Sequence, residues 1–297
     1  MRWYFLDKLT LKSYAKINFS IDILSKRKDG YHNVEMIMQS ISLADKLFFE
    51  KQAEEIEIET KHSKLPTGKE NLVYQAAEIL FKNYNIKAGL KVRINKNIPL
   101  SAGLAGGSGN AAATLLAVNK LWDLNLSKQK LLSFAAQLGA DIPFCLQGGT
   151  CLATGIGTEL KKLSPVSEMN LVVVKPPISV STAKIYQSLD LNKINKHPQN
   201  AKIIFGLRQG RQEIILDNLR NVLEEVTFVL YPKVKKLKQE MSQLSDKALM
   251  SGSGPTILGF VKNENQALLA KEKLTDKLSD DYQIFTAKTV NQAIKEI

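Results

Sequence analysis

The chain has 297 residues, of which 44% are hydrophobic and 24% charged, and its formal net charge is +12. This composition excludes a disordered or collagen-like chain, and the length is near the upper limit for one domain, so we expect two domains. The positive charge indicates an anionic partner, such as a phosphorylated metabolite, a nucleic acid or a membrane surface. Because the lysines are dispersed along the chain, a solvated basic surface is favoured over a stripe that binds nucleic acid.

Cysteine content and the N-terminal residues predict a cytoplasmic protein without a membrane partner. The two cysteines, Cys145 and Cys151, can form neither a disulfide framework nor a zinc-binding spacing, which fits a reducing compartment. Charges at positions 2, 7, 8 and 12 interrupt the apolar core that a signal peptide would need. No apolar run approaches the ~20 residues that span a bilayer.

The first half of the chain predicts strands followed by helices. Alternating apolar residues predict strands over 11–24, 37–51, 55–60 and 89–98. Apolar residues at helical spacing predict helices over 71–84, 108–122 and 127–138. The glycine-rich run over 148–160 is expected to form a strand, a turn and a second strand.

Polarity rises and a proline appears over 161–170, so we expect one domain over 1–165 and a second over 166–297. The sequence of the second domain predicts a strand over 171–176 and helices over 182–189 and within 211–244. A pair of strands over 248–261, a helix over 264–278 and a final strand over 282–290 are expected to follow. This order is that of a split β-α-β sandwich. The predicted fold class is therefore α+β with two domains.

The stretch "NIPLSAGLAGGSGNAAATLLAVNKLW", residues 97–122, places four glycines just before and at the start of a predicted helix. Free backbone amides and the helix dipole at such a point bind phosphate, and the hydroxyl of Ser108 can contact a phosphate oxygen or Mg²⁺. The alternative is a tight strand-to-helix turn without a ligand. No Walker A motif occurs, and a dinucleotide fingerprint over "GSGNAA" lacks its acidic residue, since Asp123 comes too early.

Two charged residues are candidates for chemistry. Asp141, in "GADIPFCLQGG", is either the N-cap of a short helix or a carboxylate that accepts a proton from a substrate hydroxyl. Lys16, in "YAKINFSIDIL", lies among alternating apolar residues and either extends its head group to solvent or has a catalytic role. The residues by themselves leave both alternatives open.

Two further segments carry weaker signals. Tyr31 and His32 follow a predicted turn in "KRKDGYHNVEM", where an aromatic ring can stack on a base or simply pack. In "MSGSGPTILGF", Gly252 and Gly254 flank Ser253, so the segment is either a hairpin loop or a backbone nest that supports a phosphate site.

In combination, "IPLSAGLAGGSGNAAA", "GADIPFCLQGGTCLATGIG" and "MSGSGPTILGF" resemble the three motifs of the GHMP kinase superfamily. The resemblance runs along essentially the whole chain. It implies an N-terminal domain like domain 2 of ribosomal protein S5 and a C-terminal ferredoxin-like domain. "YAKINFSIDILSKRKDGYHNVEMIMQSISLAD" together with "GADIPF" is similar to those superfamily members whose acceptor is a methylerythritol carrying a cytidine diphosphate, in the non-mevalonate isoprenoid pathway.

The resemblance implies that the γ-phosphoryl group of ATP, accompanied by Mg²⁺, passes to the 2-hydroxyl of that acceptor. It implies catalytic roles for Lys16 and Asp141, and contacts to the cytidine end by Asn18, Tyr31, His32 and Tyr186. The loop around the ATP phosphates would comprise Pro99, Leu100, Ser101, Ala102, Gly103, Leu104, Ala105, Gly106, Gly107, Ser108 and Gly109, with Asn71 and Lys96 near the nucleotide. A small-molecule substrate is expected, with neither nucleic acid nor membrane as a partner. The oligomeric state and the protein ligands of Mg²⁺ stay open.

Two positions depart from the superfamily pattern. Gly109 stands where the loop usually has a second hydroxyl residue, which puts in doubt any phosphate or metal contact assigned to that side chain. Thr158 stands where a glutamate is usual, and Glu159 follows one residue later.

Two rival functions remain at this level. The first is a related kinase acting on homoserine, mevalonate or a sugar, which would not need a cytosine site between Tyr31 and Tyr186. The second is a nucleic-acid-binding module, whose affinity for RNA would depend steeply on salt.

Overall fold

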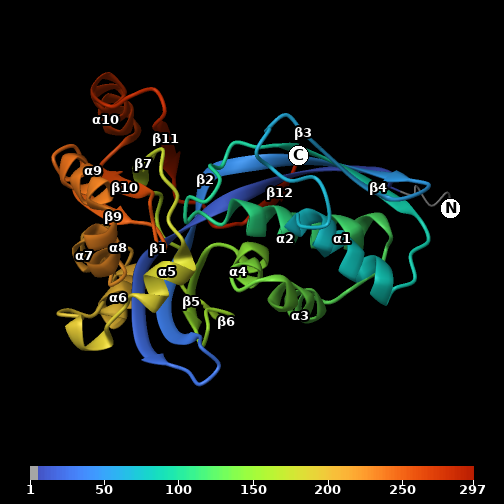
Figure 1. Cartoon of the computed structure of the whole chain (residues 1–297), viewed down its shortest axis with the longest axis horizontal. Helices are drawn as coiled ribbons and strands as arrows, with labels where there is room; N and C mark the ends of the chain where they lie inside the picture. The colour runs from blue at the N-terminus through green and yellow to red at the C-terminus, as the bar shows by residue number, and fades with distance from the viewer. Residues whose placement is uncertain (1–5) are drawn as a thin grey trace.

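The computed structural model describes residues 6–297. Two β-sheets, one in each half of the molecule, organise the fold, and helices cover one face of each (Figure 1). The larger sheet has eight strands and the smaller sheet has four. The α+β class and the two-part architecture predicted from the sequence are confirmed.

The larger sheet is built around a long antiparallel hairpin. Its strands are β1 (Lys8–Lys26), β2 (His32–Gln52), β3 (Ile56–Thr60), β4 (Gly89–Asn95), β5 (Thr150–Thr154), β6 (Glu159–Lys162), β8 (Arg220–Asn221) and β12 (Ile294–Glu296). The main order is β12-β1-β2-β4-β3, while β5 pairs with β2 and β6 extends from β5. A register shift between Asn18 and Ser20 interrupts the pairing of β1 with β2. Such a bulge re-aims the side chains that follow it.

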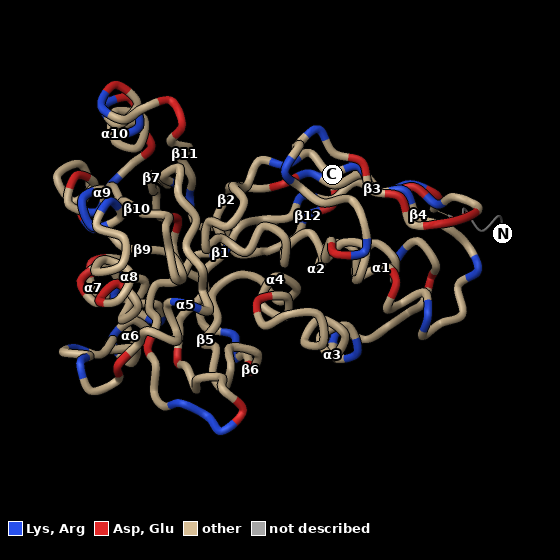
Figure 2. The backbone as a smooth tube through the Cα atoms, viewed as in Figure 1, with Lys and Arg blue, Asp and Glu red and all other residues tan. Residues whose placement is uncertain are grey.

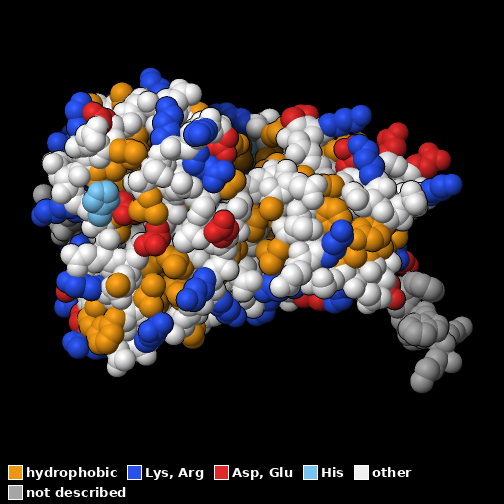
Figure 3. All heavy atoms as spheres, turned by 90° about the horizontal axis from the view of Figure 1, so that it is seen from below, with side chains coloured by type: hydrophobic (Ala, Val, Ile, Leu, Met, Phe, Trp, Pro, Cys, Tyr) orange, Lys and Arg blue, Asp and Glu red, His pale blue; other side chains and the backbone are white. Residues whose placement is uncertain are grey.

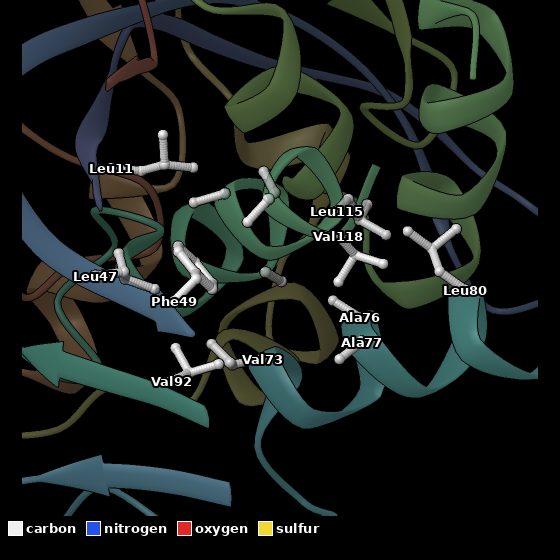
Figure 4. Close-up of a cluster of buried hydrophobic side chains, with 14 of the residues drawn as sticks. Leu11, Leu47, Phe49, Val73, Ala76, Ala77, Leu80, Val92, Leu115 and Val118 are labelled. Atoms are coloured by element: carbon white, nitrogen blue, oxygen red, sulfur yellow. The ribbon is translucent and has the colours of Figure 1, made fainter. Parts of the chain in front are cut away.

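Three helices pack against the larger sheet: α1 (Leu72–Asn83), α2 (Gly106–Leu121) and α4 (Ile142–Gln147). Helix α3 (Lys128–Leu138) packs against these three helices. Figure 4 shows the core between sheet and helices, with Leu47, Phe49 and Val92 of the sheet facing Val73 of α1 and Val118 of α2. Helix α2 is buried on most of its sides, and alanines at 111–113 let it lie close to its neighbours. This packing fixes the position of the glycine-rich turn that starts α2.

The smaller sheet consists of β7 (Asn170–Lys175), β9 (Lys247–Met250), β10 (Ile257–Val261) and β11 (Gln283–Lys288) in the order β11-β7-β10-β9. This order is that of a ferredoxin-like split β-α-β sandwich, as predicted. The helices of this half are α5 (Thr182–Gln187), α6 (Asn200–Gln209), α7 (Gln212–Asn218), α8 (Glu224–Leu230), α9 (Pro232–Ser242) and α10 (Glu264–Lys277), with a 3-10 turn over Leu191–Lys193.

Four elements were not predicted from the sequence: the 3-10 turn over Leu191–Lys193, α6, β8 and β12. Strands β8 and β12 have two and three residues, too few for a periodic pattern. Both pair with β1, β12 through Leu11 and Glu296 and β8 in parallel through Ser20 and Arg220. Two strands of the C-terminal half therefore complete the larger sheet, and the boundary at residue 165 stays a prediction.

Charged residues are distributed along the whole described backbone (Figure 2), and the face drawn in Figure 3 shows them scattered rather than gathered in one stripe. The densest basic run, residues 233–238, lies on α9, where Val234 and Leu237 are buried and Lys233, Lys235 and Lys236 face solvent. A solvated basic face, as expected from the sequence, is confirmed there. Within residues 6–297, no helix combines the length and apolarity needed to cross a membrane.

Candidate active site

A cleft of about 660 Å³ lies between the two halves of the molecule. It is lined by residues of β1 and β2, the loop that precedes α2, the start of α4, helix α5 and the loop between β9 and β10. Of the residues predicted from the sequence, the cleft wall includes Lys16, Asn18, Tyr31, His32, Gly103, Ser108, Asp141 and Tyr186. Residues up to 237 positions apart in the sequence, Lys16 and Ser253, therefore meet in one cavity.

Lys16 and Asp141 form an ion pair at the wall of the cleft. Lys16 Nζ lies 3.9 Å from Asp141 Oδ2, and only 6% of the lysine side chain is exposed. The same ammonium donates a hydrogen bond of 3.0 Å to Asn18 Oδ1, two residues along β1. Because period-2 alternation places Lys16 and Asn18 on the same face, β1 presents both toward the cleft.

Asp141 occupies the N-cap position of α4, which was the structural alternative considered from the sequence. Its φ and ψ are −84° and −16°, and its carboxylate accepts no capping hydrogen bond from the helix. Pro143 near the start of α4 has no backbone N–H to donate. The carboxylate is 39% exposed on the cleft side and can therefore reach both Lys16 and a ligand.

The glycine-rich segment ends at α2 in an open helix N-terminus. Ala105, the N-cap residue, has a left-handed φ of 55° and no side-chain group that could cap the helix. Gly103 has φ of 71°, and a Cβ there would lie 2.5 Å from the carbonyl oxygen of Ser251. The backbone N–H of Lys16 donates to the carbonyl of Leu104 at 3.0 Å, which ties β1 to this loop. Open amides and a helix dipole at this point suit an anion.

A network of buried polar groups that the sequence did not predict holds the loop between β9 and β10. Asn221 Nδ2 donates to the carbonyls of Met250 and Gly252 at 2.8 and 2.7 Å, and its Oδ1 accepts from the amide of Leu223. Ser251 Oγ donates to the carbonyl of Gly103 at 3.0 Å, which joins this loop to the one before α2. A two-residue strand carries no pattern that could have identified Asn221.

Helix α5 is tied to the same loop by a pair of hydroxyl groups. Thr182 Oγ1 lies 2.8 Å from Ser253 Oγ, at the first residue of α5. A Cβ added at Gly252 would lie 3.7 Å from Lys16 Nζ, so the β9–β10 loop also reaches the ion pair. The loop thus contacts three parts of the cleft wall.

Aromatic rings line the other end of the cleft. The rings of His32 and Tyr186 lie 5.4 Å apart between centroids at an interplanar angle of 48°, whereas Tyr31 is 61% exposed. Burial, and then the charge of Lys26, lowers the pKa of His32 below its usual 6.5. Burial, and then the charge of Asp141, raises the pKa of Tyr186 to about 12. Both rings are therefore uncharged at neutral pH.

Asn71 and Lys96 lie outside the cleft wall and use their side chains within the protein. Asn71 caps α1, because its Oδ1 accepts from the amide of Val73 at 2.9 Å. Lys96 Nζ pairs with the fully buried Asp45 at 2.5 Å, and a Cβ at Gly106 would lie 2.8 Å from that ammonium. Their predicted nearness to the nucleotide stays a prediction.

The described part of the chain contains no cluster of three or more His, Cys, Asp or Glu side chains able to hold a metal ion by themselves. Mg²⁺ usually keeps several waters and takes one or two protein oxygens together with substrate phosphates. The hydroxyl of Ser108 and the carboxylate of Asp141 offer oxygens of that kind at the cleft. These residues fit an ion that arrives with a nucleotide.

Comparison with known proteins shows to which family this chain belongs. The family of GHMP kinases N terminal domains matches residues 71–149, and the family of GHMP kinases C-terminal domains matches residues 206–280. A homoserine kinase from Cytophaga hutchinsonii has the same fold, with a TM-score of 0.78, 18% identity and coverage of 100% of this chain and 99% of that one. The chain is a GHMP kinase.

Relatives with higher sequence identity show to which family of GHMP kinases the chain belongs. A protein of Acetivibrio thermocellus named 4-diphosphocytidyl-2-C-methyl-D-erythritol kinase is 41% identical over 286 residues, which are 96% of this chain and 100% of the relative. A protein of the same name in Clostridioides difficile is 44% identical over 283 residues, with coverage of 94% and 95%. A crystal structure of 4-(cytidine 5'-diphospho)-2C-methyl-D-erythritol kinase superimposes with a TM-score of 0.82 at 29% identity, covering 95% of this chain and 99% of that one. This chain belongs to the 4-diphosphocytidyl-2-C-methyl-D-erythritol kinase family.

Proposed function

We propose that this kinase transfers the γ-phosphoryl group of ATP to the 2-hydroxyl of 4-diphosphocytidyl-2-C-methyl-D-erythritol, a step of non-mevalonate isoprenoid synthesis. The observation that carries this proposal is the Lys16–Asp141 pair at 3.9 Å in the same cleft as the N-terminal turn of α2. A phosphate held at that turn and a hydroxyl held at that pair would face each other across one cavity.

Phosphoryl transfer requires in-line positioning and neutralisation of charge more than covalent chemistry by the protein. The amides of 106–108 would bind the phosphates of ATP, and Lys16 would offset charge that develops on the transferred group. Asp141 would orient the acceptor hydroxyl and take its proton. Lys16 also holds the carboxylate in place, because its ammonium is fixed by Asn18.

The aromatic end of the cleft would bind the cytidine of the acceptor. Tyr186 presents a ring that can stack on cytosine, and Tyr31 lies exposed at the cleft wall, where it could cover the opposite face. The buried His32 and Asn18 supply polar groups beside that position. Because the tip of the β1–β2 hairpin carries Lys26, the diphosphate would also meet positive charge.

Mg²⁺ would accompany ATP and neutralise its phosphate oxygens. In this proposal Ser108 and Asp141 would provide the protein oxygens nearest to the ion. The glycine at 109 offers no second hydroxyl, so Ser108 is the one hydroxyl-bearing side chain between residues 102 and 113.

An acceptor competition assay tests the proposed function. The enzyme, with ATP and Mg²⁺, is offered 4-diphosphocytidyl-2-C-methyl-D-erythritol, homoserine or mevalonate, and ADP formation is followed. We expect turnover with the first acceptor alone and inhibition by cytidine diphosphate. Turnover with homoserine or mevalonate, or indifference to cytidine diphosphate, would contradict the proposal and favour another GHMP kinase activity.

A further inference from the structure

Ser13 of β1 lies directly against Gly109, which is in the first turn of α2. A Cβ added at Gly109 would overlap Ser13 Oγ and would lie 3.6 Å from the carbonyl oxygen of Tyr14. Ser13 has no exposed surface, and Gly109 is buried. With serine at position 13, the backbone of β1 and the first turn of α2 therefore leave no space for a side chain at position 109.

Hydrogen bonding does not explain why position 13 carries a hydroxyl group. Among the described residues, Ser13 Oγ is one of three buried side-chain oxygen atoms without a hydrogen-bond partner. A buried hydroxyl without a partner is costly, so alanine would be favoured at this position if polarity alone decided. The physical reason for serine is volume, since its Oγ fills the space beside Gly109 and interiors are close-packed.

This contact lies where the two parts of the proposed machinery approach each other. Lys16 follows Ser13 by three residues on β1, and its own backbone N–H is bonded to the carbonyl of Leu104 in the phosphate loop. The turn that contains Gly109 presents the amides that face the cleft. Added volume between strand and helix would move β1 away from α2, and Lys16 would move with the strand.

We propose that Ser13 and Gly109 act as one steric unit that sets the distance between Lys16 and the phosphate-binding turn of α2. Both are positioning residues, because neither contacts the proposed reacting atoms. The volume at the two positions is exchangeable, so a larger residue at 109 is tolerated only with a smaller one at 13. The inference rests on the proposed kinase activity for its functional consequence.

The test is a four-member cycle of wild type, Gly109→Ser, Ser13→Ala and the double variant, assayed for kcat, for KM of ATP and for cytidine diphosphate binding. We expect Gly109→Ser to lower kcat by about 10- to 100-fold, because a displacement near 1 Å at a reacting group has effects of that size. Cytidine diphosphate binding should be unchanged in all four proteins. The double variant should recover kcat to within about threefold of wild type, the recovery that exchangeable packing predicts.

Two further variants keep the test decisive. Ser13→Thr adds volume from the strand side and should lower kcat as Gly109→Ser does. Gly107→Ala adds one carbon in the same turn, where the Cβ would meet Leu72 at an unstrained 3.8 Å, and should lower the unfolding temperature less than Gly109→Ala.

Wild-type kcat in Gly109→Ser, or a loss that Ser13→Ala does not repair, would overturn the inference. If Gly109→Ser does not fold, the double variant decides: a folded, active protein supports the steric unit and an unfolded or inactive one contradicts it. A wild-type enzyme inactive on its acceptor would contradict the proposed function, and the unfolding temperatures of the same cycle would still test the steric unit.

Discussion

Lys16 on β1 and Asp141 at the start of α4 approach to 3.9 Å although 124 residues separate them in the chain. The lysine is almost fully buried and bonded to Asn18, while the carboxylate is partly exposed to the cleft. One member is therefore fixed and the other can meet a ligand. This asymmetry suits a carboxylate that receives a proton beside an ammonium held in a fixed position.

Replacing Asp141 by asparagine is expected to lower kcat by about 10²-fold or more, the scale of general acid–base catalysis. The fold should persist, because the carboxylate caps no helix. Steady-state assays with circular dichroism measure both quantities. Asp276→Asn, on the exposed face of α10, is the matched control and should keep wild-type turnover. Near-normal kcat in Asp141→Asn would refute the role.

Tyr186→Leu tests the base-stacking end of the cleft. Stacking of an aromatic ring on a base contributes about 1–3 kcal/mol, so the affinity for cytidine diphosphate should fall by about 5- to 150-fold. Tyr186→Phe keeps the ring and should bind almost as wild type does. Calorimetric titration measures the affinities. Equal binding by the leucine and phenylalanine variants would show that this ring does not stack on the ligand.

His32 predicts a pH dependence of stability. Because burial and Lys26 lower its pKa below 6.5, the unfolded chain binds a proton at this ring more readily than the folded protein does. The free energy of unfolding should therefore decrease as the pH falls through 6.5, whereas well above 6.5 the ring is neutral in both states and has no effect on the pH dependence. Unfolding temperatures measured in steps from about pH 7.5 to 5 should drop more steeply for wild type than for His32→Gln. If the unfolding temperatures of wild type and His32→Gln changed in parallel with pH, His32 would be protonated as easily in the folded state as in the unfolded state.

Asn221→Ala should weaken both the fold and the reaction. The substitution leaves the carbonyls of Met250 and Gly252 and the amide of Leu223 without their partner. A buried polar group that loses its partner lowers the free energy of unfolding by about 1–3 kcal/mol. Since Gly252 lies beside Lys16, kcat should fall at temperatures where the variant is still folded. Asn218→Ala loses one bond within α7 and is the control, with a much smaller effect on both. An Asn221→Ala protein as active and as stable as the Asn218→Ala control would contradict the prediction.

The buried Lys96–Asp45 pair gives a stability prediction. Lys96→Met leaves the carboxylate of Asp45 buried without its cation, which typically costs about 3–5 kcal/mol of unfolding free energy. Adding Asp45→Asn removes that charge and keeps an oxygen for the amides of Asn97 and Ile98, so the double variant should recover much of the loss. Urea titrations measure this.

The same pair of variants tests the predicted nearness of Lys96 to the nucleotide. A KM for ATP that stays raised in the stabilised double variant would support a contact between this ammonium and ATP. A normal KM would leave the lysine with a purely structural role. A double variant no more stable than Lys96→Met would contradict the charge argument itself.

The sequence determined the order of most elements. Helical spacing over 71–84 and alternation over 11–24 each reflect one buried face, so the pattern reports the local structure directly. The glycine-rich run before a helix likewise indicated an anion site, because that chemistry depends on adjacent backbone groups. The short strands β8 and β12 have no such local pattern, since partners far away in the chain define them.

Only the tertiary structure shows what the candidate side chains contact. Asp141 lies at an N-cap but accepts no capping hydrogen bond, and Lys96, which follows β4, pairs with the carboxylate of Asp45 on β2. Asn221 gained its importance from a loop that follows it by 29–31 residues. The sequence determines the local backbone geometry, and with it the polar groups that each segment can present to a site. Which groups meet depends on the packing of two sheets against each other, and that packing is a property of contacts distant in the chain.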